Sequence, residues 1–119
     1  MPHRITLEIA VDCETDAVAA ASAGANRLEL CADLAGHGYT PTLSLIRAAA
    51  ALPDIRTVAM VRPPGASAAA RAFNYSDSDR ASVLRAAEAV LEAGAGGIVF
   101  GCLKSDFDVD QALVSELVA

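Results

Sequence analysis

The sequence contains no tryptophan, and aromatic residues make up only 4% of its 119 residues. The hydrophobic fraction reaches 54%, but 27 of those residues are alanines. Alanine favours helices and buries little area, so the core must depend on leucine, isoleucine, valine and the few aromatic side chains. We therefore expect modest stability for an isolated monomer.

Basic residues are also scarce. Nine lysines and arginines stand against 15 aspartates and glutamates, which gives a net charge of −6, and the basic residues form no cluster. Because binding to a phosphate backbone depends on such clusters, we expect no nucleic-acid partner. No apolar run approaches the length of about 18 residues that a membrane span requires, so no membrane association is expected.

The three cysteines show no CxxC or other tight metal-binding spacing. Acidic residues occur too early in the sequence for a secretory signal peptide, so we expect a cytoplasmic location. In a reducing compartment the cysteines predict free thiols, packing, metal binding or catalysis rather than a disulfide framework. The length indicates one small domain and excludes a closed eight-stranded (β/α) barrel, which needs about 250 residues.

Apolar, β-prone segments alternate with alanine-rich helical segments along the chain. Strands are expected over 5–11, 27–31, 57–62 and 97–101, and helices over 14–23, 42–52, 77–93 and from 111 onward. Loops that contain glycine and proline are expected over 32–41 and 63–75. Helix starts are marked by Thr42, by a Ser76–Asp79 capping box and by Asp110, and helix ends by Gly24 and Gly94. Four such βα units predict an α/β fold with a parallel sheet covered by helices.

Charged residues interrupt these strands on one face. Because strand side chains alternate, the charged residues Glu8, Arg27, Glu29 and Arg62 fall opposite their apolar neighbours. A parallel sheet buried on both sides reads as nearly continuously apolar, and an unpaired buried charge costs several kcal/mol. We interpret this face as a candidate site, with Glu8 or Glu29 as general acid/base and Arg27 and Arg62 holding a small anionic or carbonyl substrate. The alternative is a structural ion pair of Arg27 with Glu8 or Glu29, or simple exposure at strand ends.

Cys13, Cys31 and Cys102 all fall near the carboxyl ends of predicted strands, the edge at which α/β folds bind ligands. Their convergence would suit a soft metal ion such as Cu(I), which prefers thiolate ligands. Small buried cysteines are also common in cores, so inert packing stays open as an alternative. Further candidate ligands in loops at this edge are His37, Asp12, Asp106 and Asp108, for which solvation or capping is the alternative.

Six short motifs occur in a fixed order along nearly the whole chain. They are Leu7–Ile9, Gly24–Cys31, Thr40–Pro41, Met60–Pro63, Tyr75–Asp77 and Gly97–Gly101. Together they resemble the N-terminal half of the CutC copper-homeostasis family. The resemblance implies a cytoplasmic protein with a TIM-type barrel, of which residues 1–119 would form a single partial domain of four βα units. It also implies copper homeostasis with Cu(I) binding, and a pocket lined by Glu8, Arg27, Glu29 and Arg62.

The sequence departs from the family pattern at one position that bears on copper. The family commonly has a cysteine where this chain has Ala10, and that cysteine and the one matching Cys31 form the proposed copper pair. We therefore expect Cys13 or Cys102 to act as the second ligand.

Two further functions compete with a copper-binding protein: a barrel enzyme of unknown reaction that uses the Glu/Arg pocket, and a truncated, inactive fragment. An open half barrel exposes its first and fourth strands, which predicts a homodimer or association with a separate C-terminal half.

Overall fold

The computed structural model describes residues 4–63 and 73–119, so part of the loop expected over 63–75 lies outside the described residues. The strands are β1 (Glu8–Val11), β2 (Arg27–Leu30), β3 (Arg56–Met60) and β4 (Ile98–Val99). The helices are α1 (Glu14–Ser22), α2 (Leu43–Ala50), α4 (Asp77–Glu92) and α5 (Gln111–Val118), with a short 3-10 turn, η1 (Leu34–Gly36). Within these two ranges no helix is both long enough and apolar enough to cross a membrane.

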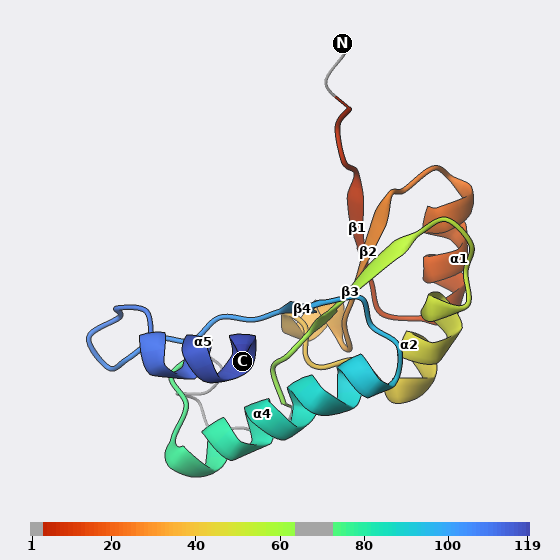
Figure 1. Cartoon of the computed structure of the whole chain (residues 1–119). Coiled ribbons are helices and arrows are strands. Elements are labelled where there is room, and N and C mark those ends of the chain that lie inside the picture. The colour runs from red at the N-terminus through yellow and green to blue at the C-terminus, as the bar shows by residue number, and fades with distance from the viewer. Residues whose placement is uncertain (1–3, 64–72) are drawn as a thin grey trace.

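The four strands form one parallel sheet in the order β1-β2-β3-β4, which confirms the predicted α/β fold (Figure 1). Helices α1, α2 and α4 contact the strands and pack in series against one another. The core lies between the sheet and these helices. Its largest fully buried side chains include Leu28 and Leu30 of β2, Ile46 of α2, and Val83 and Val90 of α4.

The helices begin where the sequence places their caps. The Thr42 hydroxyl accepts a hydrogen bond from the Leu45 amide at 3.3 Å, and Ser76 and Asp79 form the predicted capping box. The Asp110 carboxylate accepts a hydrogen bond from the amide of Leu113, the third residue of α5. Glycines in the left-handed region, Gly24 and Gly94, follow the ends of α1 and α4. Each of these signals depends on a few neighbouring residues, which is why the sequence alone is enough to locate them.

The strands are shorter than the apolar pattern predicts. The first strand begins at Glu8 rather than at residue 5, because Ile5 lies at the sheet edge with 88% of its surface exposed. The Leu7 carbonyl still accepts a hydrogen bond from the Asn26 amide at 2.9 Å. The segment 32–41, expected as a plain loop, contains the 3-10 turn η1, which Asp33 caps by accepting from the Gly36 amide.

Candidate functional site

The sheet face opposite the helices carries the charged strand residues. Along β2 the side chains of Leu28 and Leu30 are buried, whereas those of Arg27 and Glu29 are only partly buried. The strand register sets Glu8 beside Arg27, and Arg27 in turn beside Arg56. Alternation along the strands therefore places the charged side chains on the face that the helices leave open.

Glu8 and Arg27 form an ion pair between β1 and β2, from the Arg27 Nε to a Glu8 carboxylate oxygen. The two side chains keep 28% and 41% of their surface exposed. Water therefore screens the pair, and such pairs contribute about 1 kcal/mol or less to stability. The contact matches the alternative that the sequence left open, a structural ion pair of Arg27 with Glu8.

Glu29 lies beside Cys31, at the carboxyl end of β2. The Cys31 thiol donates to Glu29 Oε1 at 3.7 Å and lies 3.9 Å from the Glu29 carbonyl oxygen. Burial raises the pKa of the Cys31 thiol to about 12, with further contributions from the negative charges of Glu29 and Asp12 and a smaller opposing effect of Arg62. The group is therefore a protonated thiol at neutral pH.

Met60, at the end of β3, brings a second sulfur to the same place. At Gly38 a Cβ atom would lie 3.0 Å from the Met60 Sδ and 3.8 Å from the Cys31 Cβ, so the loop packs against both side chains, and its φ of +86° favours glycine there. The cysteine pattern of the sequence did not point to Met60 as a candidate sulfur ligand. The strand register is the feature that brings Met60 next to Cys31. Leu30 of β2 pairs with Ala59 of β3, and the next residues along the two strands are Cys31 and Met60.

Arg62 lies past the end of β3 and is only 5% exposed. Its guanidinium carbon is 4.7 Å from the centre of the Tyr39 ring and 5.5 Å from that of Phe73, and its Nη2 donates to the Gly36 carbonyl at 3.4 Å. These groups line an open pocket of about 530 Å³, made by Ala35, Gly36, His37, Tyr39, Arg62 and Phe73. Stacking on two rings holds the planar cation in one orientation.

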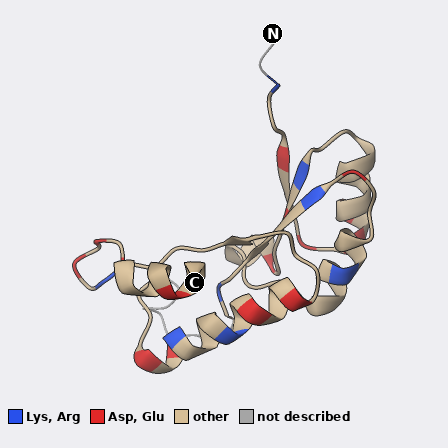
Figure 2. Cartoon of the chain, in the orientation of Figure 1, with Lys and Arg blue, Asp and Glu red and all other residues tan. Residues whose placement is uncertain are grey.

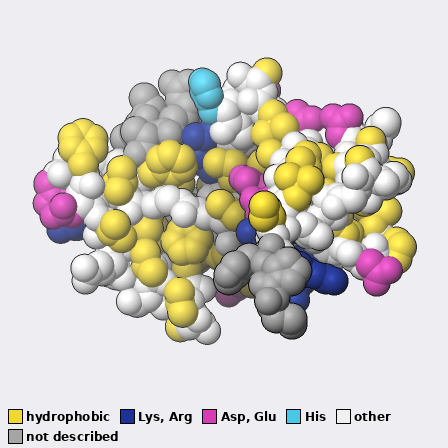
Figure 3. All heavy atoms as spheres, turned by 90° about the horizontal axis from the view of Figure 1, so that it is seen from above, with side chains coloured by type: hydrophobic (Ala, Val, Ile, Leu, Met, Phe, Trp, Pro, Cys, Tyr) yellow, Lys and Arg dark blue, Asp and Glu magenta, His cyan; other side chains and the backbone are white. Residues whose placement is uncertain are grey.

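Two of the five aromatic residues of the chain therefore meet at Arg62, which the sequence did not reveal. Thr40 fixes the loop to the strand end, because its amide donates to the Arg62 carbonyl and its hydroxyl accepts from the Arg62 amide, both at 2.9 Å. His37 is exposed at the edge of this pocket. Figure 3 shows a histidine side chain and basic side chains near each other on one face of the molecule. Asp12 acts structurally here, since its carboxylate accepts from the Leu34 amide of η1.

The four charged residues predicted to share a pocket fall at two ends of the sheet. Arg62 lies six positions after Arg56, the strand neighbour of Arg27. At about 3.3 Å per residue these two positions lie about 20 Å apart along β3 and its extension. Glu8 and Arg27 thus lie together at the amino ends of the strands, Glu29 contacts Cys31 further along, and Arg62 lies with aromatic residues at the carboxyl ends.

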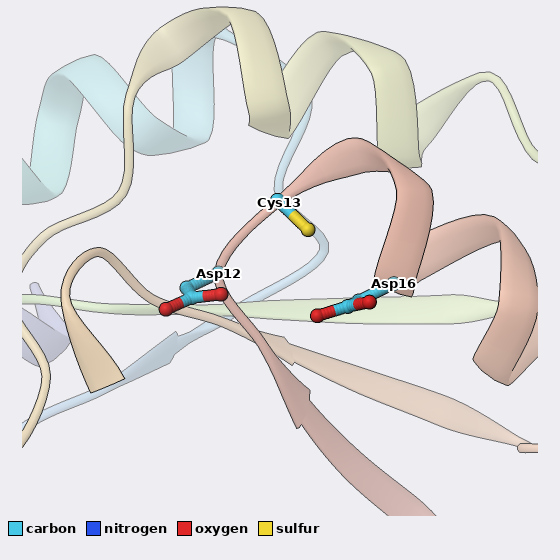
Figure 4. A group of neighbouring side chains, drawn as sticks. All are labelled: Asp12, Cys13 and Asp16. Atoms are coloured by element: carbon cyan, nitrogen blue, oxygen red, sulfur yellow. The ribbon is translucent and has the colours of Figure 1, made fainter. Parts of the chain in front are cut away.

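The other two cysteines have different neighbours from Cys31. Cys13 is exposed at the start of α1, where it and the carboxylates of Asp12 and Asp16 offer ligand atoms within 4.8 Å of one another (Figure 4). Cys102 is buried with its thiol 3.6 Å from the Asp110 carbonyl, and burial raises its pKa.

No other group of three candidate ligands with atoms this close occurs in residues 4–63 and 73–119, so the three cysteines do not form one ligand group in these ranges. All three thiols are free.

Asp106 and Asp108 lie in the exposed loop before α5, on a separate part of the surface. The Lys104 ammonium is 3.6 Å from the Asp106 carboxylate, which also accepts from the Asp108 amide at 3.0 Å. That amide is the main cause that lowers the pKa of Asp106. These contacts fit the solvated, loop-stabilising alternative for the two aspartates.

Comparison with known proteins identifies relatives over nearly the whole chain. The sequence model of the CutC family matches residues 5–119. Family protein CutC of Mesorhizobium japonicum is 39% identical over 93% of this chain, and that of Aliivibrio fischeri is 34% identical over 96%. A crystal structure from Streptococcus agalactiae, described as a candidate copper homeostasis protein CutC, superposes with a TM-score of 0.80 at 25% identity and covers 96% of the chain.

The chain spans less than half the length of the curated relatives it matches. It covers 41% of the Mesorhizobium protein, 44% of the Aliivibrio protein and 54% of the solved Streptococcus chain. Together with the parallel four-stranded sheet, the structural match confirms four βα units of a TIM-type barrel.

Proposed function

Because the chain belongs to the CutC family, we propose that it serves copper homeostasis by binding Cu(I) at the carboxyl end of β2. Cys31 is the central ligand of this proposal. The copper ion is the cargo of such a protein, so the site has to take it up and release it.

The observation that carries the proposal is the meeting of two sulfur side chains at Gly38. The Met60 Sδ and the Cys31 Cβ both lie within 4 Å of the position that a Cβ of Gly38 would take. Thiolate and thioether sulfurs are the soft ligands that Cu(I) prefers. Met60 thereby offers a replacement for the second family cysteine, whose position holds Ala10 here.

The surroundings of Cys31 make copper uptake depend on proton release. The thiol must lose its proton before it ligates a metal, and burial together with Glu29 keeps that proton bound. Glu29 Oε1, at 3.7 Å from the sulfur, is the nearest acceptor for this proton. The site should therefore bind Cu(I) reversibly rather than with the affinity of a preformed pair of thiolates.

An anaerobic titration with a competing Cu(I) chelator tests the proposal on four single variants. Cys31→Ala should abolish binding, and Met60→Leu, which keeps the volume but removes the sulfur, should weaken it about tenfold. Cys13→Ala and Cys102→Ala are the matched cysteine controls and should leave binding unchanged. Loss of binding in either control would make that cysteine the second ligand, and equally weak binding by wild type and Cys31→Ala would remove the copper site.

A second candidate function is the binding of a small anionic or carbonyl substrate at Arg62. It is favoured by one observation, the pocket of about 530 Å³ in which the nearly buried Arg62 stacks on Tyr39. A thermal-shift screen of small carboxylates and phosphates tests it. A ligand that raises the melting temperature of wild type but not of Arg62→Ala would support an enzyme-like pocket. If no carboxylate or phosphate in the screen raises the melting temperature, this second function is ruled out.

We also propose a cytoplasmic location for the protein. Its three cysteines are all free thiols, two of them buried, and such thiols persist in a reducing compartment. Cell fractionation tests the location.

A further inference from the structure

An open pocket at the amino-terminal end of the sheet gathers three of the nine basic residues of the chain. Its volume is about 840 Å³, and it is lined by Arg4, Ile5, Thr6, Asn26, Arg27, Asp54, Ile55 and Arg56. The chain as a whole carries a net charge of −6, so a pocket lined by three arginines has the opposite charge to the chain. Neither proposed function uses the pocket, which lies at the opposite end of the strands from Arg62.

Two of these arginines lie side by side on the open face of the sheet. Arg27 and Arg56 are register partners on β2 and β3, and Figure 2 shows basic residues on two neighbouring strands. Their side chains point to the same face because Leu28 and Thr57, the next pair, are buried on the other. Neighbouring strands lie about 4.8 Å apart. Like charges directly opposite each other destabilise a sheet unless a negative charge lies between them.

The carboxylates of this region only partly neutralise the arginines. The Arg27 Nε donates a hydrogen bond to the Glu8 carboxylate, which leaves the terminal N–H groups of that guanidinium available to a ligand. Among the described residues, no ion pair involves Arg4 or Arg56. Asp54 also lines the pocket but forms no ion pair with the arginines there.

Uncharged donors face the same pocket. The Asn26 Oδ1 accepts a hydrogen bond from the Leu7 amide at 2.8 Å, which orients the side-chain amide and leaves its N–H groups as donors. Thr6 adds a hydroxyl to the lining. The pocket thus combines guanidinium, amide and hydroxyl donors, the set that binds oxygen-rich anions.

We propose that this pocket binds a small phosphate-bearing molecule whose phosphate group bridges Arg27 and Arg56. The planar guanidinium groups donate paired hydrogen bonds to phosphate oxygens, and the anion removes the repulsion between the two in-register cations. Arg4 and Asn26 complete the donor set. The proposed site differs from the copper and Arg62 sites in position and residues.

Inorganic phosphate is the probe. Backbone amide NMR shifts of the 119-residue chain are followed during a phosphate titration, with sodium chloride at equal ionic strength as the reference. Saturable shifts should gather at Asn26, Arg27 and Arg56. Arg56→Gln should weaken the affinity about tenfold, which corresponds to one lost charge-assisted interaction. Arg47→Gln, which removes an exposed arginine from α2, is the matched control and should bind like wild type.

Three results would overturn the proposal: shifts that chloride reproduces, shifts that centre on Arg62, and unchanged affinity in Arg56→Gln. Arg56 is exposed, so its replacement should leave the fold intact, and circular dichroism checks this. A Cu(I) titration of the same variant separates this proposal from the copper site, because Arg56→Gln should keep wild-type copper binding whether or not phosphate binds.

Discussion

Cys31 and Cys13 are two thiols in opposite environments. Cys31 is buried, with a pKa raised to about 12, whereas Cys13 is exposed at the start of α1. Only the thiolate reacts with alkylating agents, so both access and ionisation protect Cys31. At pH 8 iodoacetamide should modify Cys13 while Cys31 and Cys102 stay unmodified, as measured by peptide mass spectrometry.

The same reaction in urea is the control for this difference. Unfolding exposes the three thiols to one environment, so all should then react at similar rates. Alkylation of Cys31 at the rate of Cys13 in the folded chain would contradict the described burial.

The raised pKa of Cys31 also predicts how Cu(I) binding varies with pH. Below about pH 12 the free thiol is protonated, so each binding event releases one proton. The affinity should therefore rise about tenfold for each unit of pH between 6 and 9. Chelator competition at several pH values measures this slope. A pH-independent affinity would mean that Cys31 is not a ligand, and Cys13→Ala, as the control, should keep the slope.

At the scale of single residues, strand alternation was enough to predict which side chains face away from the helices. Arg27 and Glu29 follow this rule because the alternation is local to their strand. The surroundings of Arg62 could not be predicted in the same way. Tyr39 and Phe73 reach it from segments 23 and 11 residues away in the sequence, and only the folded loops set their ring positions.

Between elements, Arg80 ties helix α4 to helix α5. Its guanidinium forms an ion pair with Asp110, the cap of α5, and its Nη2 lies 3.4 Å from the Glu116 carboxylate. The Leu113 amide and Arg80 hold the pKa of Asp110 below its ordinary value of 3.8. One aspartate therefore serves as helix cap and as interhelical partner.

Asp110→Ala should lower the free energy of unfolding at pH 7, because it removes both contacts. The folded-state pKa of Asp110 is lowered, so its contribution is present above the unfolded pKa and is lost as the pH falls through the folded value. The deficit of the variant in urea unfolding should therefore shrink below about pH 4.

Asp108→Ala is the matched control, since that carboxylate lies in the same loop and forms no ion pair with any residue in the described ranges. Equal stability of the two variants at pH 7 would remove the proposed role of Asp110.

At this scale the sequence was enough to predict the helix caps, but not the ion pairs and hydrogen bonds that join different elements. The box of Ser76 and Asp79 lies within four residues and has a recognisable pattern. The pairing of Arg80 with Asp110 joins positions 30 residues apart, and nothing in the local sequence distinguishes Arg80 from Arg85, the other arginine of α4. The 3-10 turn η1 was missed for a related reason, because its amide at Leu34 is held by the distant Asp12.

At the scale of the whole molecule, helices cover one face of the sheet, and β1 and β4 form its two edges, with no further strand paired to them within residues 4–63 and 73–119. Purely parallel sheets normally have both faces covered or close into barrels. The described face opposite the helices instead leaves Ala10 exposed and Val99 37% exposed. The family match runs over residues 5–119, so we predict a single partial domain that unfolds as one unit and gains stability from further strands at its edges.

We predict that a second copy of the chain supplies those strands. A twofold axis along the barrel would place β4 of one copy beside β1 of the other, with all eight strands parallel. Light scattering coupled to size exclusion should then give twice the mass of 12.2 kDa, and the melting temperature should rise with protein concentration. A C-terminal half of the barrel supplied on a separate chain would compete for the same edges.

Two lysine substitutions distinguish strand pairing at the sheet edge from nonspecific association through exposed apolar surface. Leu7 beside the β1 edge and Leu91 on α4 are exposed to nearly the same extent, 49% and 48%. A lysine at a sheet edge blocks strand pairing, so Leu7→Lys should shift the chain toward the monomer, whereas Leu91→Lys should dimerise like wild type. If both variants lose the dimer equally, apolar surface in general drives association. If the wild-type chain is a monomer with cooperative melting, the open edges are stable in water and the half barrel folds without a partner.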